Sequence, residues 1–482
     1  MLQTLSPSGQ LKGAVDLDKE AITSFWSVGP SPSLFPPLPQ DAEFWNASCD
    51  SWAHQTGDIG HGGGWRALDN AKGIIGDFKM EFCSNSLMSL LPLLPDDALL
   101  TSVHLDRQHY PLAALFVAGD ELFEYAFRPE DGLGNGLTDF AAAGDSSRPN
   151  QRRVQSGAFG GPDGAGTKTQ NVFFRSDGDR TLGPDQRNPP HVLGPGPIEA
   201  LAALGVSFGS LTAHPDGSVD TSEIAGFDPD LVVRPFGWKG HRATIRGISE
   251  ESFRIHLGLV STRIQERVHQ GHLNPAALGD GPWSDVDADG QSAEIDDGML
   301  TTITAYLAQL EVPVIRPPGT ERLQEAFAAG QHLFVQVGCA SCHIPTLELS
   351  RPEIPLDATH TVDVARDGEE PKLEPKDGQE SAFLVHLFSD LRRHDMGPGL
   401  AAPTAQSHIP ARVFLTRPLW GLADTAPYLH DGRAPTIHAA TLAHGGEAED
   451  SRLAYHGLSP ADQGALQVYL LSLTRTPGLL VP

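Results

Sequence analysis

The residues that most clearly predict chemistry are Cys339-Ala-Ser-Cys342-His343. Two thiols separated by two residues can each form a thioether with one vinyl group of a haem, and the adjacent imidazole can then bind the iron. We therefore predict one covalent haem c, attached through Cys339 and Cys342, with His343 as the proximal iron ligand.

A Cys-x-x-Cys pair also occurs in zinc sites and in thioredoxin-like redox centres. Zinc usually needs further soft ligands, and only Cys49 and Cys83 remain in the chain. Those two can form a disulfide or stay as free thiols. Apolar side chains in Glu321–Phe334 recur at helical spacing, unlike the strand that precedes a thioredoxin motif. A helix that runs directly into Gly-Cys-x-x-Cys-His is typical of cytochrome c domains.

The second axial ligand decides what a haem iron can do. His/Met and bis-His coordination favour electron transfer, whereas an open position lets peroxide or O₂ bind. Met396, His394, His430 and His444 all follow the haem motif. Each of these residues taken alone is more commonly part of a surface or a core, so their spacing leaves the choice open.

Several motifs resemble those of bacterial di-haem cytochrome c peroxidases, and in particular the thiol-oxidoreductase-like di-haem branch of that superfamily. The similar region runs from about Asn188 to the end of the chain and contains Phe236-Gly-Trp-Lys239, Gly338–Pro345, His394-Asp-Met-Gly397, Leu419-Trp-Gly421, Thr425–Arg433 and His444-Gly-Gly-Glu-Ala448. The resemblance implies that His444 is the distal iron ligand, with Met396 as the alternative. Arg433 is then a partner for a haem propionate, which a guanidinium can bind through two hydrogen bonds.

The chain departs from this family in having one haem motif where the family carries two. Phe159–Gly166 stands where relatives carry the first motif. In the peroxidases, peroxide reacts at the first haem, and the C-terminal haem only passes electrons. The resemblance therefore implies a C-terminal electron-transfer domain preceded by a haem-less, degenerate cytochrome-like domain.

A second pattern, Asp285, Asp287, Asp289 and Asp296 with a glycine after the third aspartate, matches the spacing of a calcium-binding loop. Oxygen ligands on alternate residues can wrap Ca²⁺ while the glycine permits the turn. However, the last position holds Asp instead of the longer Glu, and Gly281-Pro282 stands where a helix should enter the loop. An acidic surface turn is therefore the alternative to calcium binding.

We expect these groups to be positioned by a mainly α fold with long irregular loops. Ser459 is a good N-cap and Pro460 suits the first position of a final helix, which should pack against the helix before the haem motif. Arg351–Gln379 is charged and rich in Pro and Gly, so we expect a long excursion over the surface. Further predicted helices are Pro197–Leu204, Ser249–Val268 (a strand is the alternative) and Met299–Leu310.

We divide the chain into three expected parts. Residues 1–150 have no assigned role, residues 151–315 form the degenerate cytochrome-like domain, and residues 316–482 form the haem domain. The formal charge of −27 disfavours nucleic acid and anionic membranes as partners and suits docking to a basic redox protein. No run of apolar residues is long enough to span a membrane.

Covalent haem is attached outside the cytoplasm, so we expect a periplasmic or extracellular protein. Met1–Ser33 lacks the pattern of a secretory signal, so the signal either has been removed or lies upstream. The leading hypothesis for the function is single-electron transfer. The alternatives are a peroxidase-like oxidoreductase that acts at the remaining haem, and a partner- or calcium-binding scaffold in which the haem is structural.

Overall fold

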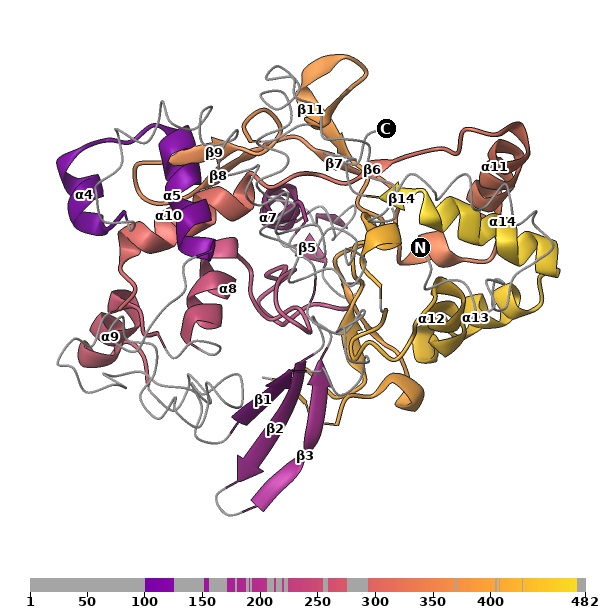
Figure 1. Ribbon diagram of the computed structural model, residues 1–482, viewed down its shortest axis with the longest axis horizontal. Helices are drawn as coiled ribbons and strands as arrows, with labels where there is room; N and C mark the ends of the chain where they lie inside the picture. Colours follow the sequence, from indigo (N-terminus) through magenta and orange to yellow (C-terminus); the bar gives the residue numbers. More distant parts are fainter. Residues whose placement is uncertain are drawn as a thin grey trace, which may run out of the picture.

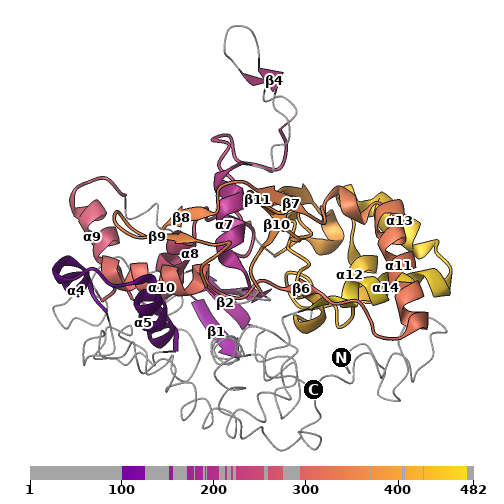
Figure 2. The same ribbon diagram turned by 90° about the horizontal axis from the view of Figure 1, so that it is seen from above.

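The structure is a computed structural model that describes residues 100–124, 151–155, 171–177, 180–187, 190, 193–205, 212–213, 219–220, 224–254, 259–274 and 294–474, apart from residues 369–370, 404, 407 and 427. Two groups of helices lie on opposite sides of the molecule, with α7 (Pro195–Ala203) and short strands between them (Figure 1, Figure 2). The first group contains α4 (Ser102–Arg107), α5 (Leu112–Glu124), α8 (Ile245–Ser252), α9 (Thr262–His269) and α10 (Asp297–Ala308). The second contains α11 (Glu321–Gln336), α12 (Ile437–Ala443), α13 (Glu449–His456) and α14 (Pro460–Leu471).

The described strands form small antiparallel sheets. One sheet has the order β1 (Gln151–Gln155), β2 (Asn171–Asp177), β3 (Arg180–Arg187), and another has the order β10 (Glu374–Lys376), β11 (Gln379–Val385), β7 (Leu347–Leu349). The two-stranded pairs are β4 (Thr212–Ala213) with β5 (Val219–Asp220), β6 (Val314–Ile315) with β14 (Leu473–Thr474), β8 (Glu353–Pro355) with β9 (Thr361–Asp363), and β12 (Arg393–Asp395) with β13 (Val413–Leu415). Helices therefore predominate, as the sequence predicted.

The helices α11 and α14 cross at Gly330. A Cβ atom there would clash with the carbonyl oxygen of Ala465 and lie 2.6 Å from the Cβ of Tyr469, so glycine lets the two backbones meet. Phe327 and Phe334 lie on either side of this glycine and pack against the Tyr469 ring, with centroid distances of 5.4 and 5.6 Å. The predicted packing of the last helix against the helix before the haem motif is confirmed.

The same crossing recurs between α5 and α10. A Cβ atom on Gly119 would clash with the carbonyl oxygen of Thr302 and lie 2.6 Å from the Cβ of Tyr306. Phe116 and Phe123 pack against the Tyr306 ring with centroid distances of 5.5 and 5.3 Å. Because the Phe-x-x-Gly-x-x-x-Phe spacing is identical in both helices, α5 and α10 form an internal repeat of α11 and α14.

The repeat extends to the turns that precede α8 and α12, which are Phe236–Thr244 and Tyr428–Thr436. In each turn the N–H of the first residue donates to the carbonyl oxygen six residues later, with N···O distances of 3.0 and 2.8 Å. The threonine that closes each turn then caps the following helix by accepting a backbone N–H three residues on. By this correspondence, Ser252 at the end of α8 is the counterpart of His444 after α12.

Two hydrophobic cores hold the helical groups together. Side chains of α5, α7 and α10 build the first core, and side chains of α11, α12 and α14 build the second. Ile354, Leu356, Val362 and Leu373 are buried in the first core, so the expectation that Arg351–Gln379 runs over the surface was wrong for these residues. In β8 and β9 the middle residue of each short strand, Ile354 or Val362, is the buried one. The first core thus draws on chain from both sides of the boundaries expected near residues 150 and 315.

Other predicted elements had mixed outcomes. The helices predicted at Pro197–Leu204 and Met299–Leu310 are α7 and α10. The single helix predicted over Ser249–Val268 was wrong, because α8 ends at Ser252 and α9 begins at Thr262. Among the described helices, none is both long and apolar enough to cross a bilayer.

Candidate haem site

The predicted attachment residues lie on one tight turn at the end of α11. Gly338 leaves the helix with a left-handed φ of 87°, and a Cβ atom there would lie 2.7 Å from Oγ of Ser451 on α13. A 3₁₀ turn begins at Cys339, whose carbonyl oxygen accepts the backbone N–H of His343 at 2.9 Å. Cys339 and Cys342 are free thiols and half-buried. Burial raises the pKa of Cys339 to about 11, so its thiol keeps its proton at neutral pH.

His343 has the tautomer expected of an iron ligand. Its Nδ1 lies 3.0 Å from the carbonyl oxygen of Phe388, and because a carbonyl only accepts, Nδ1 donates. Burial lowers the pKa of His343 to about 4, with a further contribution from His444 nearby, so the imidazole is neutral. Metal-binding histidines characteristically donate one ring N–H to such an acceptor and bind the metal with the other nitrogen. The residue therefore fits the proximal role, in which Nε2 would bind the iron, and this role stays a prediction.

His444 shows the same arrangement. It follows α12 directly, and its Nδ1 lies 2.8 Å from the carbonyl oxygen of Ala440, one turn earlier. Burial lowers the pKa of His444, which favours the neutral imidazole. His444 also contributes to the lowered pKa of His343. Two neutral imidazoles, each with Nε2 available, fit the two axial positions of a haem iron, and the assignment stays a prediction.

Met396, the alternative distal ligand, lies beside the turn that carries His444. Its carbonyl oxygen is 3.1 Å from the position of a Cβ on Gly445, and its N–H donates to the carbonyl oxygen of Arg412 at 2.9 Å. The half-buried Met396 and His444 are therefore brought together from positions 48 residues apart in the sequence. The choice between them stays a prediction.

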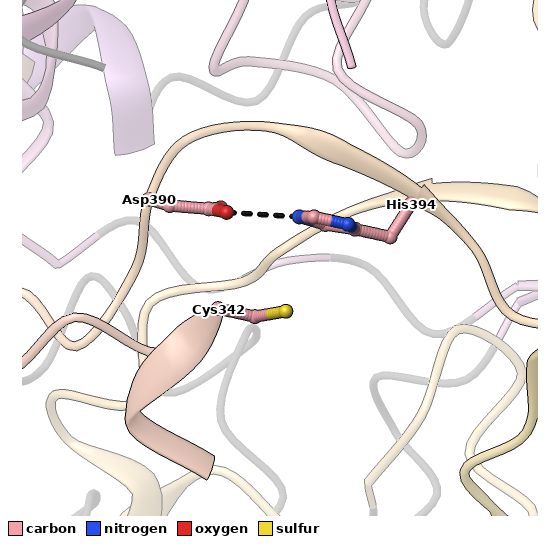
Figure 3. Close-up of side chains that lie close together, drawn as sticks. All are labelled: Cys342, Asp390 and His394. Atoms are coloured by element: carbon pink, nitrogen blue, oxygen red, sulfur yellow. Dashed lines mark hydrogen bonds and ion pairs between the residues drawn. The ribbon is translucent and has the colours of Figure 1, made fainter. Parts of the chain in front are cut away.

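His394 is committed to two carboxylates. Its Nε2 lies 2.8 Å from Oδ2 of Asp390, and its Nδ1 lies 2.8 Å from Oε2 of Glu447. Carboxylates accept, so both ring nitrogens donate and the ring is an imidazolium, in line with a pKa raised to about 11, chiefly by Asp390. Figure 3 shows the imidazole directed at Asp390, with the sulfur of Cys342 close by; one ligand atom from each of the three residues lies within 4.8 Å of the others. With both nitrogens occupied, His394 is not arranged as an iron ligand.

Arg433, the predicted partner of a haem propionate, is half-exposed and already bonded. Its Nε lies 2.6 Å and its Nη2 2.5 Å from Oδ2 of Asp431, while Nη1 donates to the carbonyl oxygen of Gly399 at 2.9 Å. A propionate would have to share or replace these partners. Its role stays a prediction.

Two buried cations that were not predicted as site residues join the two halves of the internal repeat. Lys239 is fully buried, donates to the carbonyl oxygens of Pro410, Ala411 and Val413 at 2.7, 2.6 and 3.2 Å, and lies 4.0 Å from the centre of the Phe414 ring.

Arg417 is the second of these cations. Its Nη2 donates to the carbonyl oxygens of Gly237 and Trp238 at 2.5 and 2.6 Å, and burial lowers its pKa to about 10. Carbonyl partners leave no side-chain pattern in a sequence, so the role of neither cation was predicted, although Lys239 stands in one of the motifs that carry the family resemblance. Both cations therefore fasten the first half of the repeat to the second.

The calcium prediction falls mostly outside the described residues, which include neither Asp285, Asp287 nor Asp289. Asp296 is described and is the N-cap of α10. One of its carboxylate oxygens accepts the N–H of Met299 at 2.9 Å, and the other accepts the N–H of Ser102 at 2.7 Å. These bonds give Asp296 a structural role, and calcium binding stays a prediction.

The internal repeat indicates what the first half lacks. Counted from Gly119 as from Gly330, the positions that correspond to Cys339–His343 hold Arg128-Pro-Glu-Asp-Gly132, which contains neither Cys nor His. The resemblance placed the missing motif at Phe159–Gly166 instead, so the two locations differ. Both segments, and the remaining cysteines Cys49 and Cys83, lie outside the described residues. On sequence alone, the first half has no pair of thiols at the corresponding place.

Of the comparisons with known proteins, the one with family models agrees with the motifs. No curated protein matches the chain in sequence. Among solved structures, "a MauG-like protein associated with microbial copper homeostasis" is 18% identical, with a TM-score of 0.25, and the match covers 58% of this chain and 82% of that chain. The family model described as "Di-haem oxidoreductase, putative peroxidase" matches residues 218–473, more than half of the chain and all of the haem site described above. The chain belongs to this di-haem oxidoreductase family.

Proposed function

We propose that the protein is an extracytoplasmic c-type haem protein that carries one haem and exchanges single electrons with a redox partner. Cys339 and Cys342 would attach the haem, and His343 and His444 would bind its iron. Bound in this way, the haem iron supplies one-electron redox chemistry. The observation that carries the proposal is that both imidazoles donate Nδ1–H to a backbone carbonyl, which leaves each Nε2 available.

The proposal of a single haem is supported by the internal repeat. The first half keeps the glycine-centred helix crossing of the second half. It nevertheless has Arg128–Gly132 in place of the attachment motif and Ser252 in place of His444. It therefore offers no thioether and no axial imidazole at the equivalent positions.

Electron transfer is favoured over chemistry at the iron because a hydrogen bond to a backbone carbonyl fixes each proposed ligand. His343 follows the turn at the end of α11, and His444 bonds to its own helix. Two neutral imidazoles that occupy both axial positions would leave no iron coordination site for a substrate. The net charge of −27 suits a redox partner with a basic surface.

The test is to express the full chain with haem-maturation machinery and measure haem per chain by intact mass. We expect one haem, a low-spin spectrum in both oxidation states, and conversion to high spin in His444→Ala. Met396→Ala serves as the matched variant and should stay low-spin. Two haems or none, or a low-spin spectrum that depends on Met396 and not on His444, would contradict the proposal.

A peroxidase-like activity is the second candidate, and the description of the matched family favours it. It requires a distal position that is open or easily vacated. A ferric spectrum that is high-spin and shifts on addition of peroxide or cyanide would support this candidate. A low-spin spectrum unchanged by either reagent would exclude it.

A further inference from the structure

His394 connects the two segments that carry the proposed axial ligands. One of its nitrogens bonds to Asp390, which follows Phe388 by two residues, and the carbonyl oxygen of Phe388 orients His343. The other nitrogen bonds to Glu447, which follows His444 by three residues. A single side chain therefore spans from the proximal segment to the distal segment.

The proximal end of this connection is rigid. Asp390 is 4% exposed and also accepts the backbone N–H of Arg392 at 2.9 Å. The neighbouring Ser389 is fully buried and donates its hydroxyl to the carbonyl oxygen of Thr416 at 2.6 Å. The carboxylate that holds Nε2 of His394 thus belongs to a segment with its own fixed hydrogen bonds.

The distal end is a turn pressed against β12. A Cβ atom on Gly446 would clash with the carbonyl oxygen of Asp395, so the turn after His444 lies directly on this strand. Glu447 then binds β12 with both carboxylate oxygens: Oε1 accepts the N–H of Asp395 at 2.7 Å, and Oε2 accepts from His394. These bonds fix the turn relative to the strand.

We propose that Asp390, His394 and Glu447 form an axial strap that holds His444 at the distal position, with Glu447 as a positioning residue. The inference rests on the proposed function, because it requires His343 and His444 to be the axial ligands. Glu447 is 55% exposed at its side chain, and exposed ion pairs contribute little to global stability. Loss of Glu447 should therefore loosen the distal ligand without unfolding the protein.

The experiment compares Glu447→Ala, Glu447→Gln and Glu449→Gln in the full-length, haem-loaded protein. Glu449 lies two residues further on and pairs with Arg452, so it is a matched control for a lost carboxylate. We expect Glu447→Ala to raise the high-spin ferric fraction and to increase the affinity for cyanide about 10-fold. Mutations that remove the hydrogen-bond partners of metal ligands have effects of this size. Glu447→Gln keeps an acceptor for Asp395 and should change less, and Glu449→Gln should match the parent protein.

The outcomes separate the strap from the proposed function. If His444→Ala becomes high-spin but both Glu447 variants keep the parent spectrum and cyanide affinity, the strap is wrong and the ligand assignment stands. If His444→Ala leaves the spectrum unchanged, both proposals fail together. If Glu447→Ala fails to fold, the isosteric variant Glu447→Gln provides the test, provided that its unfolding midpoint is unchanged. A cyanide affinity equal to that of the parent protein in this variant would overturn the strap.

Discussion

Trp238 and His430 occupy equivalent positions in the two halves of the internal repeat, and they touch each other. The indole N–H of Trp238 donates to the carbonyl oxygen of His430 at 2.8 Å, and the two rings lie 5.6 Å apart. Equivalent residues can contact each other in this way only close to the axis that relates two copies, as at a symmetric dimer interface. The two turns that precede α8 and α12 therefore meet at the junction between the halves.

This contact should contribute measurably to stability. We expect Trp238→Phe to lower the free energy of unfolding by about 1–3 kcal/mol, because the carbonyl of His430 would lose its donor. Trp420→Phe is the matched control: Trp420 is 2% exposed, but its indole N–H has no partner in the part of the chain that the structure describes. Denaturant unfolding of both variants measures the difference. Equal losses would mean that the hydrogen bond contributes nothing beyond the ring's packing.

The second half of the fold was largely predictable because its signals are local. The amphipathic pattern of α11 and the cap at Ser459 depend on neighbouring residues, and α14 begins at Pro460 as predicted. The repeat was missed because its evidence is spread over Phe116, Gly119 and Phe123, far from any chemical motif. Comparing that spacing with the helix before Cys339 would have revealed it.

The site was predictable only where a motif carries the chemistry. Cys339, Cys342 and His343 were selected because of their spacing in the sequence. The hydrogen bonds of Asp390 and Glu447 to His394, by contrast, depend on how β12 contacts the turn after His444. No local pattern encodes that meeting.

The two glycine-centred helix crossings should respond alike to an added methyl group. We expect Gly119→Ala and Gly330→Ala each to lower the free energy of unfolding by about 1–3 kcal/mol, because the new Cβ meets a backbone carbonyl that cannot easily move. Gly319→Ala is the control, since no atom of the described residues lies within 4 Å of its Cβ position. Thermal unfolding checks stability, and the haem spectrum should change in Gly330→Ala alone. A spectral change in Gly119→Ala would contradict the assignment of haem to the second half.

Buried Glu199 should make stability depend on pH. Its carboxyl is 7% exposed and accepts the N–H of Ile245 at the start of α8 at 2.7 Å, and burial raises its pKa from 4.5 to about 7. Below pH 4.5 the carboxyl group is protonated in both the folded and the unfolded chain, so its ionisation does not lower the stability of the fold. Between pH 4.5 and 7 the unfolded chain loses the proton first, so the contribution of Glu199 to stability falls as the pH rises, and it is constant above pH 7.

The variant that isolates this effect is Glu199→Gln. Relative to the parent, we expect its free energy of unfolding to increase by on the order of 3 kcal/mol between pH 4.5 and 7 and then level off. Urea unfolding at intervals of pH measures the difference, and Glu353→Gln, at an exposed position, is the control. A difference that is flat with pH would mean that Glu199 is ionised in the folded protein.

At one position with a left-handed backbone, the two repeated turns carry different residues. Gly237 and its counterpart Leu429 both have left-handed backbones, with φ of 84° and 72°. A side chain at Gly237 would clash with the ring of His241, which is held by Glu251 at 2.6 Å. We expect Gly237→Ala to cost more than the 1–2 kcal/mol of left-handed strain alone. Gly378→Ala gives the strain alone, because Gly378 has φ 71° and, among the parts of the chain that the structure describes, no atom lies within 4 Å of its Cβ position. Chemical denaturation compares the two, and equal losses would mean that His241 moves aside freely and does not restrict this turn.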